Sequence, residues 1–368
     1  MNRFSRQTIL PDFGIEGQQK LSDARVLVVG AGGLGCPTLL HLAAAGVGTI
    51  GIVDGDTISE SNLNRQTLFG YQHTGKPKAS VAAEILKEKY PDLEFEVFPD
   101  FLDTNNALEV IAPFDVVVDG TDNFGTRYLI NDVCVLFKKP LVMGAIYQYE
   151  GQVMVFNYGS APLNYRDVYP NPPGQNQIPN CAETGVLGVL PGIIGTLQAA
   201  EVIKILSGVG KVLSEKILFF NLKNSSFYEV AISPNPKGRN KLPDSEEDFR
   251  SRDYNINCGL AESINWEKAL DWTLNMNNSL LVDIRETGEK PLLEKKFLTR
   301  IPMSEIRENP APLSAYENIL LVCASGQRSQ QLALELKQQF PEKKIFSVEG
   351  GILHPSSPLN SIKNDKKA

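Results

Sequence analysis

The chain has 368 residues, which is enough for two domains of ordinary size. Its content of 42% hydrophobic and 21% charged residues is that of a soluble globular protein. The net charge of −7 argues against a nucleic-acid-binding surface, because such surfaces are basic.

The N-terminus and the cysteines bear on the compartment. Residues 1–14 contain no apolar segment of the kind found in a signal peptide, so we expect a cytoplasmic protein. The five cysteines are odd in number and widely spaced, and no C-x-x-C pair occurs. We therefore expect reduced thiols rather than disulfides, and no structural zinc site. None of the three histidines lies at a spacing typical of metal ligands.

The first part of the chain alternates short apolar runs with helix-like segments. Residues 25–30 and 49–54 are predicted to be buried parallel strands, joined by a crossover helix over 34–45. The alternation continues with a helix over 78–90, strands over 95–102 and 115–122, a helix near 124–137 and a strand over 140–146. This order is typical of an α/β domain with a Rossmann-like, doubly wound sheet.

Antiparallel strands are predicted next, over residues 150–157, 216–222 and 226–232. They surround the longest apolar run of the chain, residues 185–206, which we expect to be a helix. We interpret it as a buried helix rather than a membrane span. The run is interrupted by a proline and by polar residues, namely Pro191, Gln198, Glu201 and Lys204.

The C-terminal part of the chain is predicted to form a second domain. Residues 232–253 are rich in proline, asparagine and charge, which is typical of a linker. Three short strands beyond it, separated by helical segments, predict a smaller α/β domain. The expected boundaries are 1–240 for the first domain, 241–255 for the linker, 256–360 for the second domain and 361–368 for a frayed tail.

A glycine-rich turn, residues 30–35, lies between the first strand and the first crossover helix. Backbone N–H groups at such a helix N-terminus bind phosphate. Asp54 ends the next strand, where a carboxylate can bind a ribose hydroxyl. Alternatively, the glycines and Asp54 serve only the geometry of the turn. Alone, the turn would favour a dinucleotide enzyme.

The residues after that strand favour ATP over NAD. Hydride transfer does not need a cluster of cations beside the pyrophosphate, whereas attack on a phosphate does. Another strand ends in DGTDN, so a carboxylate there lies at the ligand-binding edge of the sheet and can hold Mg²⁺ on a triphosphate. No P-loop motif occurs. The polar and charged residues concerned are Asn62, Arg65, Gln66, Lys76, Lys78, Asp119 and Asp122.

Residues 1–235 resemble the ThiF/MoeB/HesA family, the bacterial relatives of ubiquitin-activating enzymes. The matching pieces occur in the family's order: RFSRQ, GAGGLG, GIVDGD, SNLNRQ, GKPKA, DGTDN and NCAETGVLGVLPGIIGTLQAAEVIKIL. The resemblance implies that the protein adenylates the C-terminal Gly-Gly carboxylate of a ubiquitin-like sulfur carrier with ATP and Mg²⁺. It also implies a homodimer.

The resemblance assigns roles by position. Gly33 and Gly35 lie in the nucleotide turn, and Asp54 holds the ribose. Asp122 is the metal-associated carboxylate, and Arg6 reaches the nucleotide across the homodimer interface, although a solvated arm is the alternative for Arg6. The phosphates are surrounded by Asn62, Arg65 and Lys78, and Gln66 is also counted among the cofactor-binding residues.

Two further features concern cysteine positions of the family. Cys181, just before the long helix, corresponds to a cysteine that forms a covalent link with the carrier or relays sulfur, and a bystander thiol is the alternative. The family's two zinc-binding C-x-x-C pairs are absent here. Asn164 and Asp167 take the place of the first pair, and no cysteine stands near PNPKGR, so no zinc is expected. Cys36 and Cys134 lie in apolar helix patterns and are expected in the core.

Residues 256–356 resemble a rhodanese domain. Cys323 begins a C-x-x-G-x-R-S loop that leads into a helix, and backbone N–H groups in such a loop can surround a persulfide. Arg328 and the helix N-terminus are expected to lower the pKa of the Cys323 thiol. Ala324 stands where arginine is common, and the usual HIPGA stretch is absent, so an inactive docking domain is the alternative.

The sequence therefore predicts an enzyme that adenylates a carrier and then delivers sulfur from a Cys323 persulfide, giving a thiocarboxylate. The sulfur donor is a persulfide or thiosulfate, and the carrier is of the thiamine or molybdopterin type. Two alternatives stay open: a tRNA-modifying or amino-acid-activating relative, and a non-catalytic ATP-binding scaffold. We expect neither nucleic acid nor a membrane as a partner.

Overall fold

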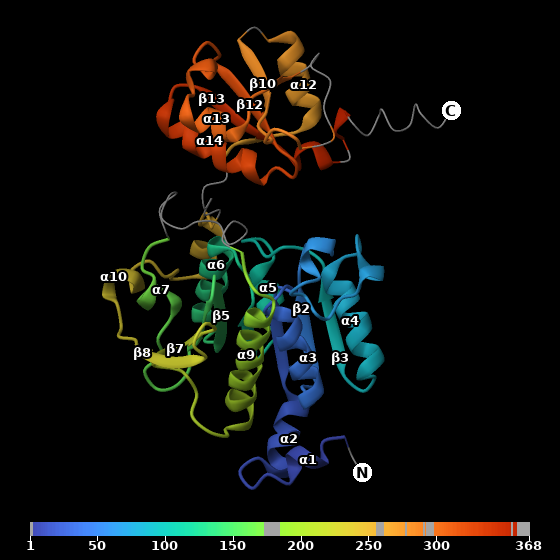
Figure 1. The fold of residues 1–368 in the computed structure, drawn as a ribbon. Coiled ribbons are helices and arrows are strands. Elements are labelled where there is room, and N and C mark those ends of the chain that lie inside the picture. Colours follow the sequence, from blue (N-terminus) through green and yellow to red (C-terminus); the bar gives the residue numbers. More distant parts are fainter. Residues whose placement is uncertain are drawn as a thin grey trace. The chain divides into compact units, whose positions relative to one another are not determined.

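The computed structural model describes residues 3–172, 185–254, 261–276, 278–289, 291, 298–354 and 356–358 (Figure 1). The chain divides into two compact units, Met1–Ile256 and Asn257–Ala368. This division falls beside the end of the linker that the sequence predicts.

The larger unit is built on one sheet of eight strands in the order β3-β2-β1-β4-β5-β6-β7-β8. Strands β1 to β5 pair in parallel, whereas β6, β7 and β8 continue the sheet as antiparallel strands. The predicted doubly wound sheet with an antiparallel extension is confirmed. The strands are β1 (Arg25–Val29), β2 (Thr49–Val53), β3 (Glu94–Phe98), β4 (Val116–Asp119), β5 (Leu141–Tyr147), β6 (Glu150–Phe156), β7 (Lys216–Asn221) and β8 (Ser226–Ala231).

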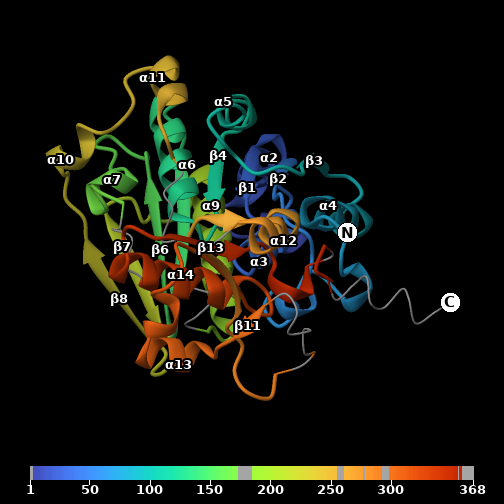
Figure 2. The same ribbon diagram turned by 90° about the horizontal axis from the view of Figure 1, so that it is seen from above.

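Helices cover both faces of this sheet (Figure 1 and Figure 2). Successive residues of a strand point to opposite faces. Val28 accordingly packs in one core with residues of α3, α4 and α9, and Leu27 packs in the other with residues of α5 and α6. The helices are α1 (Ser5–Thr8), α2 (Gly14–Asp23), α3 (Gly35–Ala45), α4 (Lys78–Lys89), α5 (Ala107–Ile111), α6 (Phe124–Leu136), α7 (Tyr165–Val168), α9 (Val189–Ser207), α10 (Pro236–Arg239) and α11 (Glu246–Ser251).

Helix α9 is long and apolar enough to cross a membrane by length and composition alone. Its inner face, which includes Leu190, Ile194 and Val202, is buried in the core of the larger unit. Glu201 is buried as well, and its carboxylate accepts a hydrogen bond of 3.0 Å from the backbone N–H of Leu213. The core helix of a globular unit can also be this long and this apolar. The burial of α9 agrees with the buried helix that the sequence predicts.

The segment that composition marks as a linker contains α11, which packs on the larger unit. Ser245 caps this helix by accepting a hydrogen bond from the backbone N–H of Asp248. The ring of Phe249 is fully buried, and the Tyr254 hydroxyl donates a hydrogen bond of 2.7 Å to the carboxylate of Asp132. Two aromatic residues thus hold a stretch that is otherwise rich in charge.

An ion pair occupies the segment to which the resemblance assigns the family's first zinc cysteines. The buried carboxylate of Asp167 accepts five hydrogen bonds, from the backbone and side chain of Asn164, the backbone N–H of Asn235 and two nitrogens of Arg239. Burial alone would raise the pKa of Asp167, but these hydrogen bonds outweigh it and lower the pKa. The cluster ties α7 to α10 through the Asp167 carboxylate.

The smaller unit has a sheet of five strands in the order β11-β10-β12-β13-β9, all paired in parallel. The predicted smaller α/β unit is confirmed. Its strands are β9 (Ser263–Ile264), β10 (Ser279–Asp283), β11 (Thr299–Arg300), β12 (Asn318–Val322) and β13 (Lys344–Val348), and its helices are α12 (Trp266–Asn275), α13 (Met303–Glu308) and α14 (Gln327–Gln339).

We expect Asp167→Ala to destabilise the larger unit by about 3 kcal/mol, because Arg239 and three amide N–H groups lose a buried acceptor. The melting temperature of this unit should fall by about 6–12 °C, measured by far-ultraviolet circular dichroism at pH 7. Because the folded pKa of Asp167 lies below its unfolded value of about 3.9, the loss is full above that pH and shrinks as the pH falls further.

The matched control is Asp92→Asn, which removes an exposed ion pair with Arg3 and should cost less than about 1 kcal/mol. The two tryptophans of the chain, Trp266 and Trp272, lie in the smaller unit, so their fluorescence should not change in either variant. An Asp167→Ala protein that melts with the wild type would contradict the structural role of the cluster.

Candidate functional site

The glycine turn between β1 and α3 leaves no room for a side chain at Gly35. A Cβ atom on Gly35 would lie 1.8 Å from the carbonyl oxygen of Gly30, and Gly30 itself has a φ of +94°. A Cβ on Gly30 would lie 3.1 Å from the carbonyl oxygen of Gly120, which follows β4. The turn therefore packs directly on the end of β4, and it presents the N-terminus of α3 at the carboxyl edge of the sheet.

Asp54 holds this turn in place. Its carboxylate accepts hydrogen bonds from the backbone N–H of Ala31, at 2.7 Å, and of Asp56, at 2.9 Å. Burial raises the pKa of Asp54, and the positive charge of Lys78 opposes that shift. The turn-holding role is thus present in the structure, and each carboxylate oxygen retains a lone pair for a ligand.

Two predicted residues lie over the same turn. A Cβ on Gly33 would lie 3.5 Å from Cγ of Arg65, and one on Gly32 would lie 3.7 Å from Nε2 of Gln66. The Gln66 side chain is buried, and its Oε1 has no hydrogen-bond partner among the residues that the structure describes. A buried amide oxygen without a partner is costly, so this atom is available to a donor on a ligand.

The backbone of Asn62 sets the position of these two side chains. Asn62 ends a short 3₁₀ helix, Glu60–Asn62, and its carbonyl oxygen accepts hydrogen bonds from the N–H groups of Arg65 and Gln66. The Arg65 guanidinium donates to the carbonyl oxygen of Ser61 at 3.0 Å. Asn62, Arg65 and Gln66 are thus brought together beside the turn.

Lys78 is the first residue of α4 and is buried. Its ammonium donates a hydrogen bond of 2.9 Å to the carboxylate of Asp56, and its backbone N–H donates to the carbonyl oxygen of the same residue. The sequence analysis missed Asp56, although it stands in the quoted GIVDGD piece. Lys76 is exposed.

The loop after β4 carries two aspartates in different surroundings. Asp119 is fully buried, and its carboxylate accepts hydrogen bonds from the backbone N–H and the hydroxyl of Thr121. Burial raises the pKa of Asp119, and the positive charge of Arg127 opposes that shift. Asp122 is exposed. Asp119 therefore shapes the loop, and Asp122 is the carboxylate that a ligand can reach.

Arg6 lies away from these residues. It is exposed on α1, which contacts the C-terminal end of α3 through a hydrogen bond of 3.1 Å from Gln7 to the carbonyl oxygen of Ala45. The glycine turn lies at the other end of α3, about 16 Å away for a helix of 11 residues (Figure 1). The structure does not bring Arg6 to the turn of its own chain.

The cysteines differ in their surroundings. Cys36 and Cys134 are buried in the core, as expected, and burial raises the pKa of the Cys36 thiol to about 12. Cys181 and Cys258 lie outside the described residues, so the role of Cys181 stays a prediction.

Cys323 lies at the end of β12, buried beneath its own loop. Its Sγ accepts hydrogen bonds from the backbone N–H of Gly326, at 3.1 Å, and from the Ser329 hydroxyl, at 3.6 Å. Arg328 donates from both terminal nitrogens to the carboxylate of Glu289. The sequence analysis did not foresee this acidic partner.

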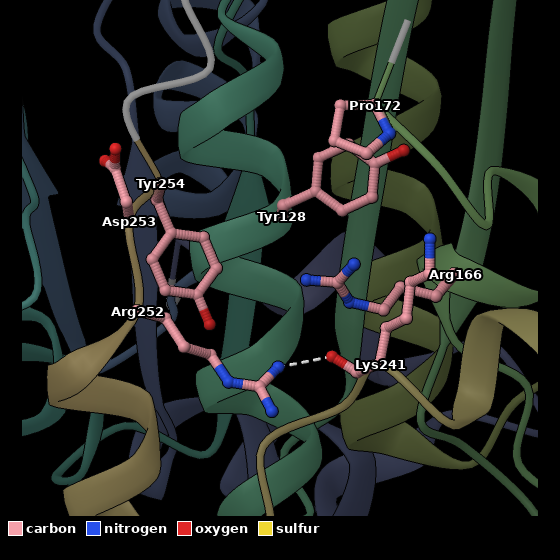
Figure 3. A pocket seen from close by; sticks show the side chains of 7 residues that line it. All are labelled: Tyr128, Arg166, Pro172, Lys241, Arg252, Asp253 and Tyr254. Atoms are coloured by element: carbon pink, nitrogen blue, oxygen red, sulfur yellow. Dashed lines mark hydrogen bonds between the residues drawn. The ribbon is translucent and has the colours of Figure 1, made fainter.

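A cavity of about 300 Å³ lies elsewhere on the larger unit, beside α6 and α7 (Figure 3). Two of its cations are already bound to acids, Arg166 to Asp132 and Arg252 to Asp248. Its lining offers none of the chemistry that the sequence predicts, so the glycine turn stays the candidate site. The lining residues are Tyr128, Arg166, Pro172, Lys241, Arg252, Asp253 and Tyr254.

Known proteins resemble this chain along nearly its whole length. It matches the ThiF family over residues 4–241. The sulfur carrier protein adenylyltransferase of Thermus thermophilus is 46% identical, over 71% of this chain and 97% of that protein. The probable adenylyltransferase/sulfurtransferase MoeZ of Mycobacterium tuberculosis is 38% identical, over 95% of this chain and 91% of that protein. The adenylyltransferase and sulfurtransferase MOCS3 of Drosophila grimshawi is 36% identical, over 95% and 82% respectively.

The fold also matches solved structures. The crystal structure of E. coli MccB with ATP aligns with a TM-score of 0.56 and 23% identity, over 64% of this chain and 73% of that chain. This likeness concerns the fold and agrees with the doubly wound architecture.

The packing of the turn gives a prediction for two neighbouring glycines. Gly35→Ala should destabilise the larger unit by about 3 kcal/mol, because the new methyl group meets backbone that cannot move away. Gly32→Ala is the matched control, since its Cβ would meet only the end of the Gln66 side chain, at 3.7 Å. Thermal melting followed by circular dichroism distinguishes them, and equal melting temperatures would contradict the close approach.

Proposed function

Because this chain belongs to the ThiF family, we propose that it adenylates the C-terminal carboxylate of a small sulfur carrier protein and then delivers sulfur to it. The observation that carries the proposal is the assembly of Arg65, Gln66 and Lys78 around the glycine turn. In the smaller unit of the same chain, a backbone N–H and a hydroxyl donate to the sulfur of Cys323. MoeZ and MOCS3, whose names join both activities, align with nearly all of this chain.

The adenylation step follows from the groups at the turn. The N-terminus of α3 binds phosphate, and Lys78 and Arg65 stabilise the charge that builds on the phosphoryl oxygens. An oxygen of the carrier's carboxylate attacks the α-phosphorus of ATP, and pyrophosphate leaves. Asp54 suits a ribose hydroxyl, since its carboxylate lies beside the turn with lone pairs to spare.

Asp122 is the residue that suits Mg²⁺ on the triphosphate. The residues that the structure describes hold no cluster of three metal-ligating side chains. Mg²⁺ needs none here, because it usually binds through one or two carboxylates together with phosphate oxygens and water. Asp122 is exposed in the loop whose Gly120 packs on the glycine turn, and this supports its assignment to the metal.

Sulfur delivery uses Cys323. The terminal sulfur of a Cys323 persulfide attacks the acyl carbon of the carrier adenylate, and AMP leaves. A thiol then attacks Sγ of Cys323, the S–S bond breaks, and the electron pair leaves with the thiocarboxylate. Cys181 is the candidate thiol within the chain, and the resulting disulfide is reduced by an external thiol. We further propose that the carrier is of the thiamine or molybdopterin type. We also propose that the protein acts in the cytoplasm.

We also propose a homodimer, in which Arg6 acts on the nucleotide of the partner. Arg6 lies one helix length from the turn of its own chain, so only a second copy brings it there. Large apolar side chains of the same unit are exposed, which suits an interface: Ile9, Leu10, Ile15, Leu187 and Val189.

Cys323→Ala tests the division of labour between the units. We expect carrier-dependent ATP–pyrophosphate exchange to stay unchanged, because adenylation uses groups of the larger unit. The variant should no longer replace an oxygen of the carrier's carboxylate by sulfur, which mass spectrometry of the carrier measures. Ser325→Ala, in the same loop, is the matched control and should retain both reactions. If the Cys323→Ala variant formed thiocarboxylate at the normal rate, Cys323 would not be the residue that delivers sulfur. If ATP–pyrophosphate exchange proceeded without a carrier, the carrier would not be the group that is adenylated.

Mixed dimers test the role of Arg6. Arg6→Ala and Asp122→Ala should each lower the exchange rate by about 100-fold or more. An equal mixture of the two variants should recover up to about a quarter of wild-type activity, because half of the dimers are hybrids with one intact site of two. Absence of recovery, with subunit exchange shown by native mass spectrometry, would count against a shared site.

A further inference from the structure

The cation beside Cys323 is bound by an acid. Nη1 and Nη2 of Arg328 donate hydrogen bonds of 2.6 Å and 2.7 Å to the two carboxylate oxygens of Glu289. This bidentate geometry uses the edge of the guanidinium with which arginine binds planar or tetrahedral oxyanions. An oxyanion that approaches Cys323 therefore meets Arg328 with that edge already occupied.

Glu289 is fixed in this position and stays charged. Its carboxylate accepts a further hydrogen bond of 2.8 Å from the backbone N–H of Glu286. The hydrogen bonds from Arg328 lower the pKa of Glu289 to about 2, so the carboxylate is anionic at neutral pH. The pKa of Arg328 is raised, first by its hydrogen bonds to Glu289 and in smaller part by the negative charges of Cys323 and Glu286. Arg328 lies in the first turn of α14, the helix that directly follows the Cys323 loop.

Two further arginines belong to the segments around Glu289. Arg285 is buried and is bound at Nε and Nη2 by the carboxylate of Asp283, while its Nη1 has no hydrogen-bond partner among the described residues. Arg300 donates from Nη2 to the carbonyl oxygens of Glu286, at 2.7 Å, and of Glu289, at 3.4 Å. Ala324 and Ser325, the two residues after Cys323, are uncharged. The loop therefore offers one backbone N–H and one hydroxyl to a sulfur anion, and the acids around it balance its cations.

These contacts bear on which sulfur donor the loop accepts. Thiosulfate is a dianion, and transfer of its outer sulfur to the Cys323 thiolate breaks the S–S bond and releases sulfite with the electron pair. The two negative charges of thiosulfate and the one of the Cys323 thiolate therefore all remain at the loop until sulfite departs. A persulfide donor, R–S–SH, transfers its outer sulfur to the same thiolate and releases a thiolate, so one negative charge is carried through the step.

We propose that Glu289 is a specificity-determining residue for the sulfur donor: by occupying both terminal nitrogens of Arg328, it disfavours thiosulfate and leaves the loop suited to a persulfide. This inference rests on the proposed sulfur transfer through Cys323. Glu289 does not touch the reacting sulfur in this structure, and it acts through the charge and the free edge of Arg328.

The experiment measures the rate of sulfur addition to Cys323 in the full chain, by mass spectrometry of the Cys323 peptide, with thiosulfate or glutathione persulfide. Glu289→Gln should raise kcat/KM for thiosulfate by about tenfold or more, because Arg328 regains a free edge and the site loses a negative charge. The rate with glutathione persulfide should change little. The gain with thiosulfate should shrink as ionic strength rises, which a merely structural effect would not do.

Glu335→Gln is the matched control, since Glu335 binds Arg307 through two hydrogen bonds of 2.9 Å and 2.7 Å on the same unit. Glu335→Gln should leave the rate of sulfur addition unchanged with either donor. The fluorescence of Trp266 and Trp272 should confirm that Glu289→Gln and Glu335→Gln are folded. Equal thiosulfate rates in wild type and Glu289→Gln, or an equal gain in Glu335→Gln, would overturn the inference and leave sulfur transfer standing. Failure of both donors to modify Cys323 in every variant would overturn the proposed sulfur transfer as well.

Discussion

The close approach of the glycine turn to the end of β4 is the constraint on which the larger unit's site depends. A Cβ on Gly35 would lie 1.8 Å from the Gly30 carbonyl oxygen, and Gly30 packs on Gly120. Because the turn is this tight, α3 begins directly at the sheet edge and its N–H groups face outward. Asp54 can then bind the turn from the next strand, and Arg65 and Gln66 can lie over it. A looser turn would separate these groups from the loop that holds Asp122.

Both candidate anion sites place a cation in contact with an acid, and the two pairs differ in what they leave free. The Lys78 ammonium has three N–H donors, and Asp56 accepts one of them. A phosphate can therefore bind Lys78 while Asp56 still holds it. Arg328, by contrast, gives both terminal nitrogens to Glu289. The first pair positions a phosphate ligand, whereas the second restrains the binding of an oxyanion.

The sequence predicts those parts of the structure that local rules dictate. Apolar runs with short turns predicted the parallel strands, and the glycine spacing predicted a phosphate-binding turn, since backbone geometry demands glycine there. The segment 241–255 shows the limit of composition. Its charge and proline content are typical of a linker, yet Phe249 and Tyr254 fix it to the larger unit. Two aromatic residues outweigh many polar ones in a short segment, because burial of each ring contributes more than any surface charge.

The partners of the charged groups were the part that the sequence did not show, and the reason lies in the topology. Asp56 and Lys78 are separated by 22 residues, Glu289 and Arg328 by 39, and Asp167 and Arg239 by 72. The edge of a parallel sheet brings the ends of distant strands together, so the residues of the first two pairs become neighbours although they share no motif. Asp167 and Arg239 meet instead through α7 and α10, which follow the antiparallel strands β6 and β8. Asp167 shows the consequence: its position matches a zinc cysteine of the family, but its chemistry is set by Arg239. A motif therefore locates a site, and the acids that reach it from other loops decide which charges it can hold.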